Sequence, residues 1–360
     1  MIMIGRGKYL KAQLAGLRDL PDQSGAWGIL LPRGKEPAIH EPDARDQVQD
    51  INPAFLTFID SEMNVDRGMW IVLSAFTLSY MLVLAFIFGP KAMGAGIPIW
   101  FTVPVVIIFI VFIVGPAVGI YFWVNSPVPP PVILSRKSRK IYAWRGRSLG
   151  WRVFNYDDVH PFIYRAQLIS TAGAATIYTP QIAILDVNRK IVDAVVVAPP
   201  SRLPSVCGMN WEFIRRYMDD VPEKVPPVLA QPPVNDKRAM LARIDQIGFS
   251  GLVGRDFKLE PSLFAWCYYY FYGVIGYWWF RSAAWLQCRG KYPEYSMEMR
   301  RAMAFEGVNP YRKEPLSTLE QDAFSGKLPR LRFRWAIIGS LSTFLWGGLW
   351  LLIAAPFLFT

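Results

Sequence analysis

Asp157, Asp158 and His160 form the cluster in this sequence that is best suited to chemistry. Carboxylates beside an imidazole can bind a metal ion or relay a proton, because histidine titrates near neutral pH and is a common metal ligand. The same residues also suit a polar turn between two strands, in which an aspartate caps the turn and Pro161 ends it. We favour the turn, and we expect no catalytic residue, no metal site and no bound cofactor.

No other established catalytic motif is present. The sequence contains no G-x-S-x-G elbow and no phosphate-binding P-loop. Its three cysteines, Cys207, Cys267 and Cys288, are scattered, which argues against a disulfide framework and fits a reducing compartment. We expect a protein that is not an enzyme. The alternative is an enzyme that acts on lipid through Asp157, Asp158 or His160.

Composition points to a membrane protein. Of the 360 residues, 52% are hydrophobic and 15% are aromatic, but only 19% are charged. Soluble domains carry about 25% charged residues, so the deficit indicates lipid-facing surface. The net charge of +11 fits attraction to anionic lipid headgroups better than nucleic-acid binding, because long apolar stretches accompany it. We therefore expect a membrane as partner and no nucleic acid.

Three apolar stretches are long enough to cross a membrane, which takes about 20 residues. They cover residues 70–88, 97–124 and 335–359, and none contains a charged residue. Pro104 and Pro116 lie in the second stretch, and a membrane helix tolerates them because neighbouring groups satisfy the freed carbonyls. We expect a transmembrane hairpin over residues 67–125 and a C-terminal transmembrane helix over residues 335–359.

The distribution of basic residues predicts the orientation of these spans. The loop between the first two contains Lys91 as its basic residue, whereas seven basic residues and no acidic one lie between residues 136 and 152. Positively charged loops stay in the cytosol. We expect a bacterial inner-membrane protein with its N-terminus and residues 126–334 in the cytosol and its C-terminus outside.

The stretch over residues 263–288 is hydrophobic but dominated by tyrosine and tryptophan, whose rings prefer the membrane interface. Arg281 would be costly in the middle of a bilayer. We favour an interfacial or re-entrant segment over a fourth span, and a crossing stays the alternative. Trp278, Trp279 and Arg281 are candidates for contact with lipid or with a protein partner.

The region between the second and third spans predicts an antiparallel meander, because short runs rich in β-branched and aromatic residues alternate with turns. These runs lie at 140–144, 151–156, 162–169, 176–185 and 190–197. A helix is expected at 211–218, with Asn210 as its cap. The predicted fold is α+β, with transmembrane helices and a cytosolic β-rich domain over 132–222. A C-terminal helix closes that domain on the plan of pleckstrin-homology-like domains.

The remaining segments are expected to be smaller cytosolic pieces. Residues 1–66 form an N-terminal segment, loosely ordered apart from one surface helix that carries Leu10, Leu14 and Leu17. Residues 223–262 form a proline-rich linker with a short helix at 236–247. Residues 289–334 form an amphipathic region with a helix at 297–305.

Two groups of basic residues are candidates for contact with anionic lipid or a protein partner. They are Arg136, Lys137, Arg139, Lys140, Arg145 and Arg147 after the second span, and Arg215 and Arg216 in the predicted helix. The ordinary roles of the first group are to orient the protein and attract it to the bilayer. In the helix, Glu212 and Arg216 are spaced to pair along its surface. We favour these structural roles.

Several motifs resemble those of an uncharacterised family of proteobacterial membrane proteins. They are Ser135–Tyr142 (SRKSRKIY), Trp211–Met218 (WEFIRRYM), Tyr292–Glu294 and Asn309–Tyr311. In that family a basic strand pair follows two N-terminal spans, and the β-rich domain ends in a tryptophan-led helix. The C-terminal span departs from this pattern.

The family is often associated with type VI secretion effectors. The resemblance therefore implies a non-enzymatic immunity or accessory protein that binds such an effector. The alternative is a membrane-anchored sensor or scaffold whose β-rich domain binds anionic lipid or a cytosolic protein. The sequence leaves the oligomeric state open.

Overall fold

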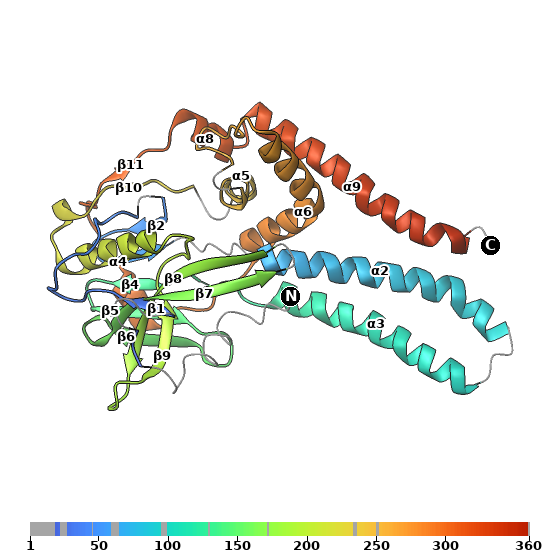
Figure 1. Ribbon diagram of the computed structural model, residues 1–360, viewed down its shortest axis with the longest axis horizontal. Coiled ribbons are helices and arrows are strands. Elements are labelled where there is room, and N and C mark those ends of the chain that lie inside the picture. The colour runs from blue at the N-terminus through green and yellow to red at the C-terminus, as the bar shows by residue number, and fades with distance from the viewer. Residues whose placement is uncertain are drawn as a thin grey trace. The chain divides into compact units, whose positions relative to one another are not determined.

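The computed structural model describes residues 19–21, 27–44, 46–58, 65–94, 99–128, 130–170, 173–232, 236–249 and 252–358. The chain forms two compact units, each built from three stretches of sequence. The β-rich unit comprises Met1–Ser61, Pro129–Gln231 and Pro293–Leu316, and the helical unit comprises Glu62–Val128, Pro232–Tyr292 and Ser317–Thr360. The fold is α+β, as the sequence predicts (Figure 1). The expected helix around Leu10, Leu14 and Leu17 lies outside the described residues.

One sheet of the β-rich unit is a five-stranded antiparallel meander. Its strands, in spatial and chain order, are β2 (Val48–Ile51), β3 (Phe55–Phe58), β4 (Ile133–Ser135), β5 (Lys140–Trp144) and β6 (Trp151–Asn155). The first membrane-length hairpin of the sequence is inserted between β3 and β4. The two strands nevertheless pair directly, with Leu56 opposite Leu134. The chain therefore returns to the same sheet after the hairpin.

The second sheet has four strands in the order β1 (Gly28–Leu30), β7 (His160–Ser170), β8 (Gly173–Leu185) and β9 (Ile191–Val196). Its pairs are antiparallel, and β7 and β8 form a long hairpin. Strands β5 to β9 lie where the sequence predicts them, but the prediction of a single meander is wrong. Strand β6 ends the first sheet, and β7 pairs with β1 and β8 in the second. A short parallel pair, β10 (Val228–Leu229) with β11 (Lys313–Glu314), links the second and third stretches of this unit.

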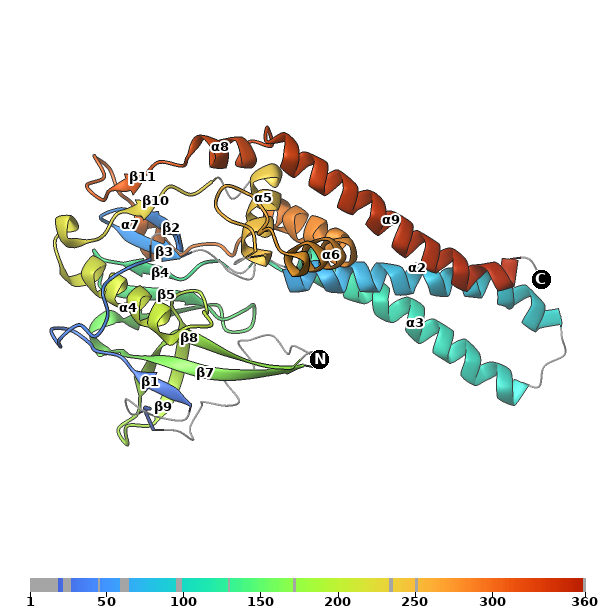
Figure 2. The same ribbon diagram turned by 45° about the horizontal axis from the view of Figure 1, so that its top comes forward.

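Helix α4 (Pro204–Asp219) packs against β7 and β8 and shares the main core of the unit with both sheets (Figure 2). Side chains alternate between the two faces of a strand, so Ile141 and Ala143 enter this core. Tyr142 points to the opposite face, where helix α7 (Met297–Met303) covers it with Met299. Each face of β5 is therefore buried by a different helix.

Two sequence expectations are wrong in detail. The first is that residues 28–58 are loosely ordered, because they form β1, β2 and β3. These strands have only three or four residues, too few for a recognisable alternation, and later strands stabilise them by pairing. The second is that Asn210 caps α4. The helix begins at Pro204, whose ring suits a first turn, and Asn210 is buried inside it. The predicted helix at 297–305 is confirmed as α7, which begins at Met297 after the Ser296 cap and ends at Met303.

Three helices of the helical unit, counted among the described residues, are long and apolar enough to cross a membrane. They are α2 (Val65–Gly94), α3 (Ile99–Asn125) and α9 (Pro329–Leu358), at the positions of the three predicted spans. Helix α3 continues through Pro104 and Pro116. Most of its described large apolar side chains are exposed, which suits a helix surrounded by lipid.

The other helices of this unit are α5 (Lys237–Gly248), α6 (Leu263–Arg289) and α8 (Thr318–Phe324). Helix α6 packs against α2, α5 and α9. A Cβ atom on Gly68 of α2 would lie 2.3 Å from the carbonyl oxygen of Trp279 in α6. Glycine is therefore required where the two helices approach, as in membrane helix pairs. The interfacial or re-entrant placement of residues 263–288 stays a prediction, as does the pleckstrin-homology-like plan.

Arg67 fastens the hairpin of α2 and α3. This side chain, in the first turn of α2, is buried. Its guanidinium donates hydrogen bonds to the carbonyl oxygens of Trp123, Ser126 and Pro127, at the end of α3. The carbonyls at a helix C-terminus lack partners within the helix and carry partial negative charge, so a cation stabilises them. The start of α2 and the end of α3 therefore lie at the same end of the hairpin.

Candidate functional site

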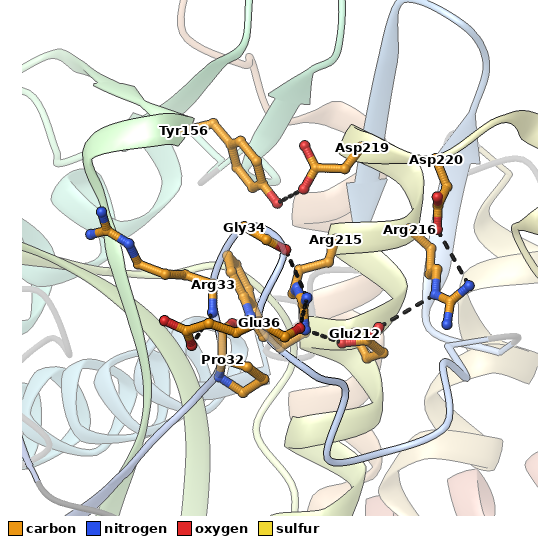
Figure 3. Close-up of polar contacts among 11 residues, drawn as sticks. Pro32, Arg33, Gly34, Glu36, Tyr156, Glu212, Arg215, Arg216, Asp219 and Asp220 are labelled. Atoms are coloured by element: carbon orange, nitrogen blue, oxygen red, sulfur yellow. Dashed lines mark hydrogen bonds and ion pairs between the residues drawn. The ribbon is translucent and has the colours of Figure 1, made fainter.

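A segment without regular secondary structure, residues 31–44, runs over helix α4, and we call it the strap. The indole Nε1 of Trp211 donates a hydrogen bond of 2.7 Å to the carbonyl oxygen of Pro32. Arg215 donates to the carbonyl oxygens of Gly34 at 2.7 Å and Glu36 at 2.6 Å (Figure 3). Side chains of the tryptophan-led helix thus hold the main chain of a distant segment.

Glu212 holds Arg215 in position. The carboxylate and the guanidinium lie 2.7 Å apart, and their side chains are only 4% and 8% exposed. Two charges removed from water need each other, because the desolvation penalty of either one alone is several kcal/mol. The predicted pairing of Glu212 with Arg216 is confirmed at 3.4 Å, and Arg216 also contacts Asp220 at 3.3 Å (Figure 3). Arg215 is therefore a structural residue, whereas Arg216 is partly exposed.

The strap lies close to α4 at a second point. A Cβ atom on Gly208 would lie 2.0 Å from Cδ2 of His40, so a side chain at this position would displace the histidine ring. Just before β2, Gln47 makes a third contact, because the amide of Asn210 in α4 donates to its Oε1 at 2.6 Å. Residues that the sequence separates by more than 160 positions are thus in direct contact.

Arg139 joins three parts of the β-rich unit. It lies in the turn between β4 and β5 with a φ of 50°, a conformation that costs energy in a residue other than glycine. Its guanidinium forms ion pairs with Asp157 at 2.5 Å and Asp219 at 3.0 Å, and it lies over the ring of Tyr156. Hydrogen bonding to Arg139 lowers the pKa of Asp157. Asp157 is therefore a counter-ion of Arg139.

The other two members of the sequence cluster have separate partners. Asp158 accepts a hydrogen bond of 2.7 Å from Asn155. The ring of His160 lies 3.1 Å from the guanidinium of Arg33, and burial with the charges of Arg33 and Arg189 lowers the pKa of His160. Within the described ranges, no group of three or more His, Cys, Asp or Glu side chains could hold a metal ion. The polar turn is confirmed, as a 3-10 turn over Tyr156–Asp158 between β6 and β7.

Most of the predicted basic patch after the second span is used inside the fold. Arg136 donates to the hydroxyl of Tyr311 and to the carbonyl oxygen of Asp220, and Arg139 has the partners described above. Lys140 pairs with Glu298 at 2.6 Å, and Arg145 pairs with Asp193. Lys137 and Arg147 have exposed side chains. The patch is thus smaller than the sequence indicates, because strands and helices far along the chain supply its counter-ions.

The three candidates in α6 have different environments. Trp278 is exposed, whereas Trp279 is partly buried where its carbonyl faces Gly68. Arg281 donates from Nε to the hydroxyl of Tyr277 at 3.1 Å, one helical turn away. Trp278 is therefore the candidate that α6 presents to its surroundings.

Sequence reasoning missed a buried polar network in the helical unit. Asp245 of α5 accepts hydrogen bonds from Tyr269 of α6 at 2.5 Å and from Arg334 of α9 at 3.1 Å. Arg334 also donates to the carbonyl oxygen of Phe257 and lies 4.1 Å above the ring of Tyr269. The signal was an aspartate within the apolar side of the predicted helix 236–247. The network ties α5 and α6 to the first turns of α9.

Comparisons with known proteins add no relative to this picture: no family model matches the chain, and no curated protein or solved structure is significantly similar to it.

Proposed function

We propose that the chain is a non-enzymatic, multi-pass inner-membrane protein whose β-rich unit lies in the cytosol and binds a protein partner. The observation that carries this proposal is how the β-rich unit uses its charges. Arg139, Arg145 and Lys140, which could have held a lipid headgroup, form ion pairs within the unit. Protein recognition is favoured over lipid capture because such paired groups offer little net charge to a membrane.

The membrane placement rests on the helical unit. Three helices are long and apolar enough to cross a bilayer, and the large apolar side chains of α3 are mostly exposed. The positively charged stretch after α3 favours the cytosolic side for the β-rich unit. Because each unit is built from three separate stretches of the chain, the β-rich unit is covalently tied to the helical unit at several points.

The identity of the partner rests on the resemblance carried by Trp211–Met218 and the associated motifs. It implies a type VI secretion effector, which the chain would neutralise as an immunity protein or assist as an accessory protein. The structure adds a physical reason for that motif to occur as a block. Trp211, Glu212 and Arg215 together hold the strap on α4.

Survival and export assays test this proposal. Cells that produce an effector encoded beside this chain would receive the wild type, Glu212→Lys or Lys137→Ala. Glu212→Lys places a third cation beside Arg215 and Arg216 and should disrupt the β-rich unit while α2, α3 and α9 still insert. Lys137→Ala changes an exposed side chain and serves as the control.

The wild type and Lys137→Ala should protect the cells or raise export of the effector, and Glu212→Lys should do neither while remaining in the membrane fraction. A wild type that changes neither survival nor export would contradict the proposal. Proteolysis would show whether the β-rich unit of Glu212→Lys is unfolded. If it is, and the variant still protects cells or raises export as well as the wild type, the β-rich unit does not bind the partner.

Binding of anionic lipid by the β-rich unit is the alternative function. It would depend on Lys137 and Arg147, the members of the basic patch whose side chains are exposed. Reversing both charges should then abolish a preference for acidic vesicles that weakens as salt increases. An unchanged preference would count against lipid binding by this stretch.

A further inference from the structure

Helix α6 has one face that the described residues of its unit leave exposed. Phe264, Phe271 and Trp278 recur at intervals of seven residues and therefore lie on one side of the helix. Their side chains are 70%, 71% and 41% exposed. The opposite side, including Tyr269 and Phe280, is buried within the helical unit. The helix is thus apolar on both faces but packed on only one.

The exposed face is aromatic and ordered. Phe264, Tyr268 and Tyr272 stack in succession along the helix, with neighbouring ring centroids 5.9 and 5.5 Å apart. Tryptophan and tyrosine are enriched at the membrane interface, because an apolar ring and a polar group suit the boundary between headgroups and hydrocarbon. The composition of this face therefore fits the boundary layer of a bilayer.

The two ends of α6 lie beside the start of α9, the start of α2 and the end of α3. Near its N-terminal end, Tyr269 meets Arg334 in the second turn of α9. Near its C-terminal end, Ala283 lies against Gly68 in the first turn of α2. The amide of Val128, just after α3, donates to the carbonyl oxygen of Lys291, just after α6.

Helices α2 and α9 run in the same direction from these ends, as Figure 1 shows within the helical unit. Phe76 of α2 and Trp346 of α9 are in ring contact, 11 and 17 residues after their helices begin. Helix α6 is about 40 Å long at 1.5 Å per residue, which would suffice to cross a bilayer. Its ends nevertheless remain at the same side of the bundle, beside the first turns of α9 and α2. Its middle contacts a point farther along α9, where the indole Nε1 of Trp346 donates to the carbonyl oxygen of Ile275.

The membrane-length helix α9 also has exposed apolar side chains. Phe333, Leu341 and Phe344 of α9, the helix against which α6 packs, are exposed apolar side chains. Cations flank α6 on both sides, with Lys258 before it and Arg289 and Lys291 at its end, all exposed. Anionic headgroups attract such residues.

We propose that α6 is a half-immersed helix whose face of Phe264, Tyr268, Phe271 and Trp278 lies in the headgroup boundary of one leaflet. That leaflet borders the start of α2, the end of α3 and the start of α9. The occupant of this face is the bilayer itself. The inference rests on the membrane placement in the proposed function and does not depend on a protein partner. Residues 260 and 291 then lie on the same side of the membrane.

The side of the membrane can be tested with two cysteine variants of the full-length chain. Glu260→Cys and Lys291→Cys change exposed residues on either side of α6. Both would be made in a Cys267→Ala, Cys288→Ala background, in which Cys207 is buried and protected. A membrane-impermeant maleimide should label both variants from the same face of oriented vesicles. Labelling from opposite faces would show that α6 crosses, and would overturn the proposal.

The depth of the exposed face can be tested at Cys267, which is exposed and lies among these aromatic residues. The purified chain would carry an environment-sensitive fluorophore there, in phosphatidylcholine and phosphatidylglycerol vesicles without any partner. A nitroxide near the headgroup should quench it more than one near the end of the acyl chain. Stronger quenching by the nitroxide near the end of the acyl chain, or quenching by neither nitroxide, would overturn the proposal. Crosslinking of Cys267 between two copies of the chain would also overturn it and would assign the face to a dimer.

These outcomes are separate from those of the survival and export assays. Failure of those assays with the expected labelling and quenching would contradict partner binding alone. Failure of labelling or quenching with intact protection would contradict the placement of α6 alone.

Discussion

Replacing Arg215 by methionine should release the strap from helix α4. The substitution keeps a long apolar stem but removes the guanidinium, which pairs with Glu212 and donates to the carbonyl oxygens of Gly34 and Glu36. Glu212 would then be a buried carboxylate whose remaining cation is Arg216 at 3.4 Å. The strap would lose two of its attachments to α4, and the helix would keep an underpaired charge.

The size of the effect follows from burial. Removing one partner of a buried ion pair costs about 3–5 kcal/mol, against a total stability of about 5–15 kcal/mol for a protein. A loss of about 3 kcal/mol raises the population of an opened strap on the order of 100-fold, since about 1.4 kcal/mol is a factor of ten. Glu212→Gln should be costly for the same reason. The double variant Arg215→Met, Glu212→Gln should lose less stability than the two single variants lose together. The difference, a coupling free energy, should be on the order of 1–3 kcal/mol.

Trypsin provides the assay, because Arg33 and Lys35 have exposed side chains on the strap. Cleavage after these two residues would be followed by mass spectrometry on the detergent-solubilised chain. Arg216→Met is the matched control, because Arg216 is the next residue and its side chain is 34% exposed. Its loss should cost less than about 1 kcal/mol. If Arg215→Met were cleaved no faster than Arg216→Met, the reasoning about the buried pair would be refuted.

Three further predictions concern packing, pH and cysteine reactivity. Gly68→Ala should lower the Tm in detergent by separating α2 from α6, at a cost of about 1–3 kcal/mol. Gly115→Ala, with nothing within 4 Å of its new Cβ atom, should not, and equal Tm values would refute the close approach. Stability of the β-rich unit should fall as the pH drops below about 6.5, because the unfolded chain protonates His160 while the folded chain resists it through a lowered pKa. In thermal unfolding, His160→Gln should make the stability of this unit less dependent on pH. An unchanged pH dependence would show that other groups cause it. A maleimide should label Cys267 but not Cys207 in native protein, because burial raises the pKa of Cys207 to about 12, and labelling of Cys207 before unfolding would contradict its burial.

Local properties of the sequence determined the longer elements. The membrane-length helices α2, α3 and α9 were predictable because their apolar length is a property of one continuous stretch. Strands β5 to β9 were predictable because each contains enough residues of the right type between recognisable turns. The pairing of Glu212 with Arg216 was predictable because residues four apart lie side by side on any α-helix.

Strands β1 to β3 and the strap were not predictable in the same way. Each strand is three or four residues long, and the strap has no periodicity at all. Their order comes from partners far along the chain, such as Leu134 for Leu56 and Trp211 for Pro32. A short segment that gains its stability from distant residues carries little local signal.

The charged residues show the division most clearly. The sequence by itself determined where positive charge accumulates, after α3 and in α4, and hence the predicted orientation of the chain. Only the tertiary structure decided which of those charges are buried and paired, as for Arg215 beside Glu212 but not for exposed Lys137. It also brought Arg334 to Asp245, 89 residues away. The physical reason is that the energy of a charge depends on its burial and its counter-ions, and both are set by the elements that fold against it.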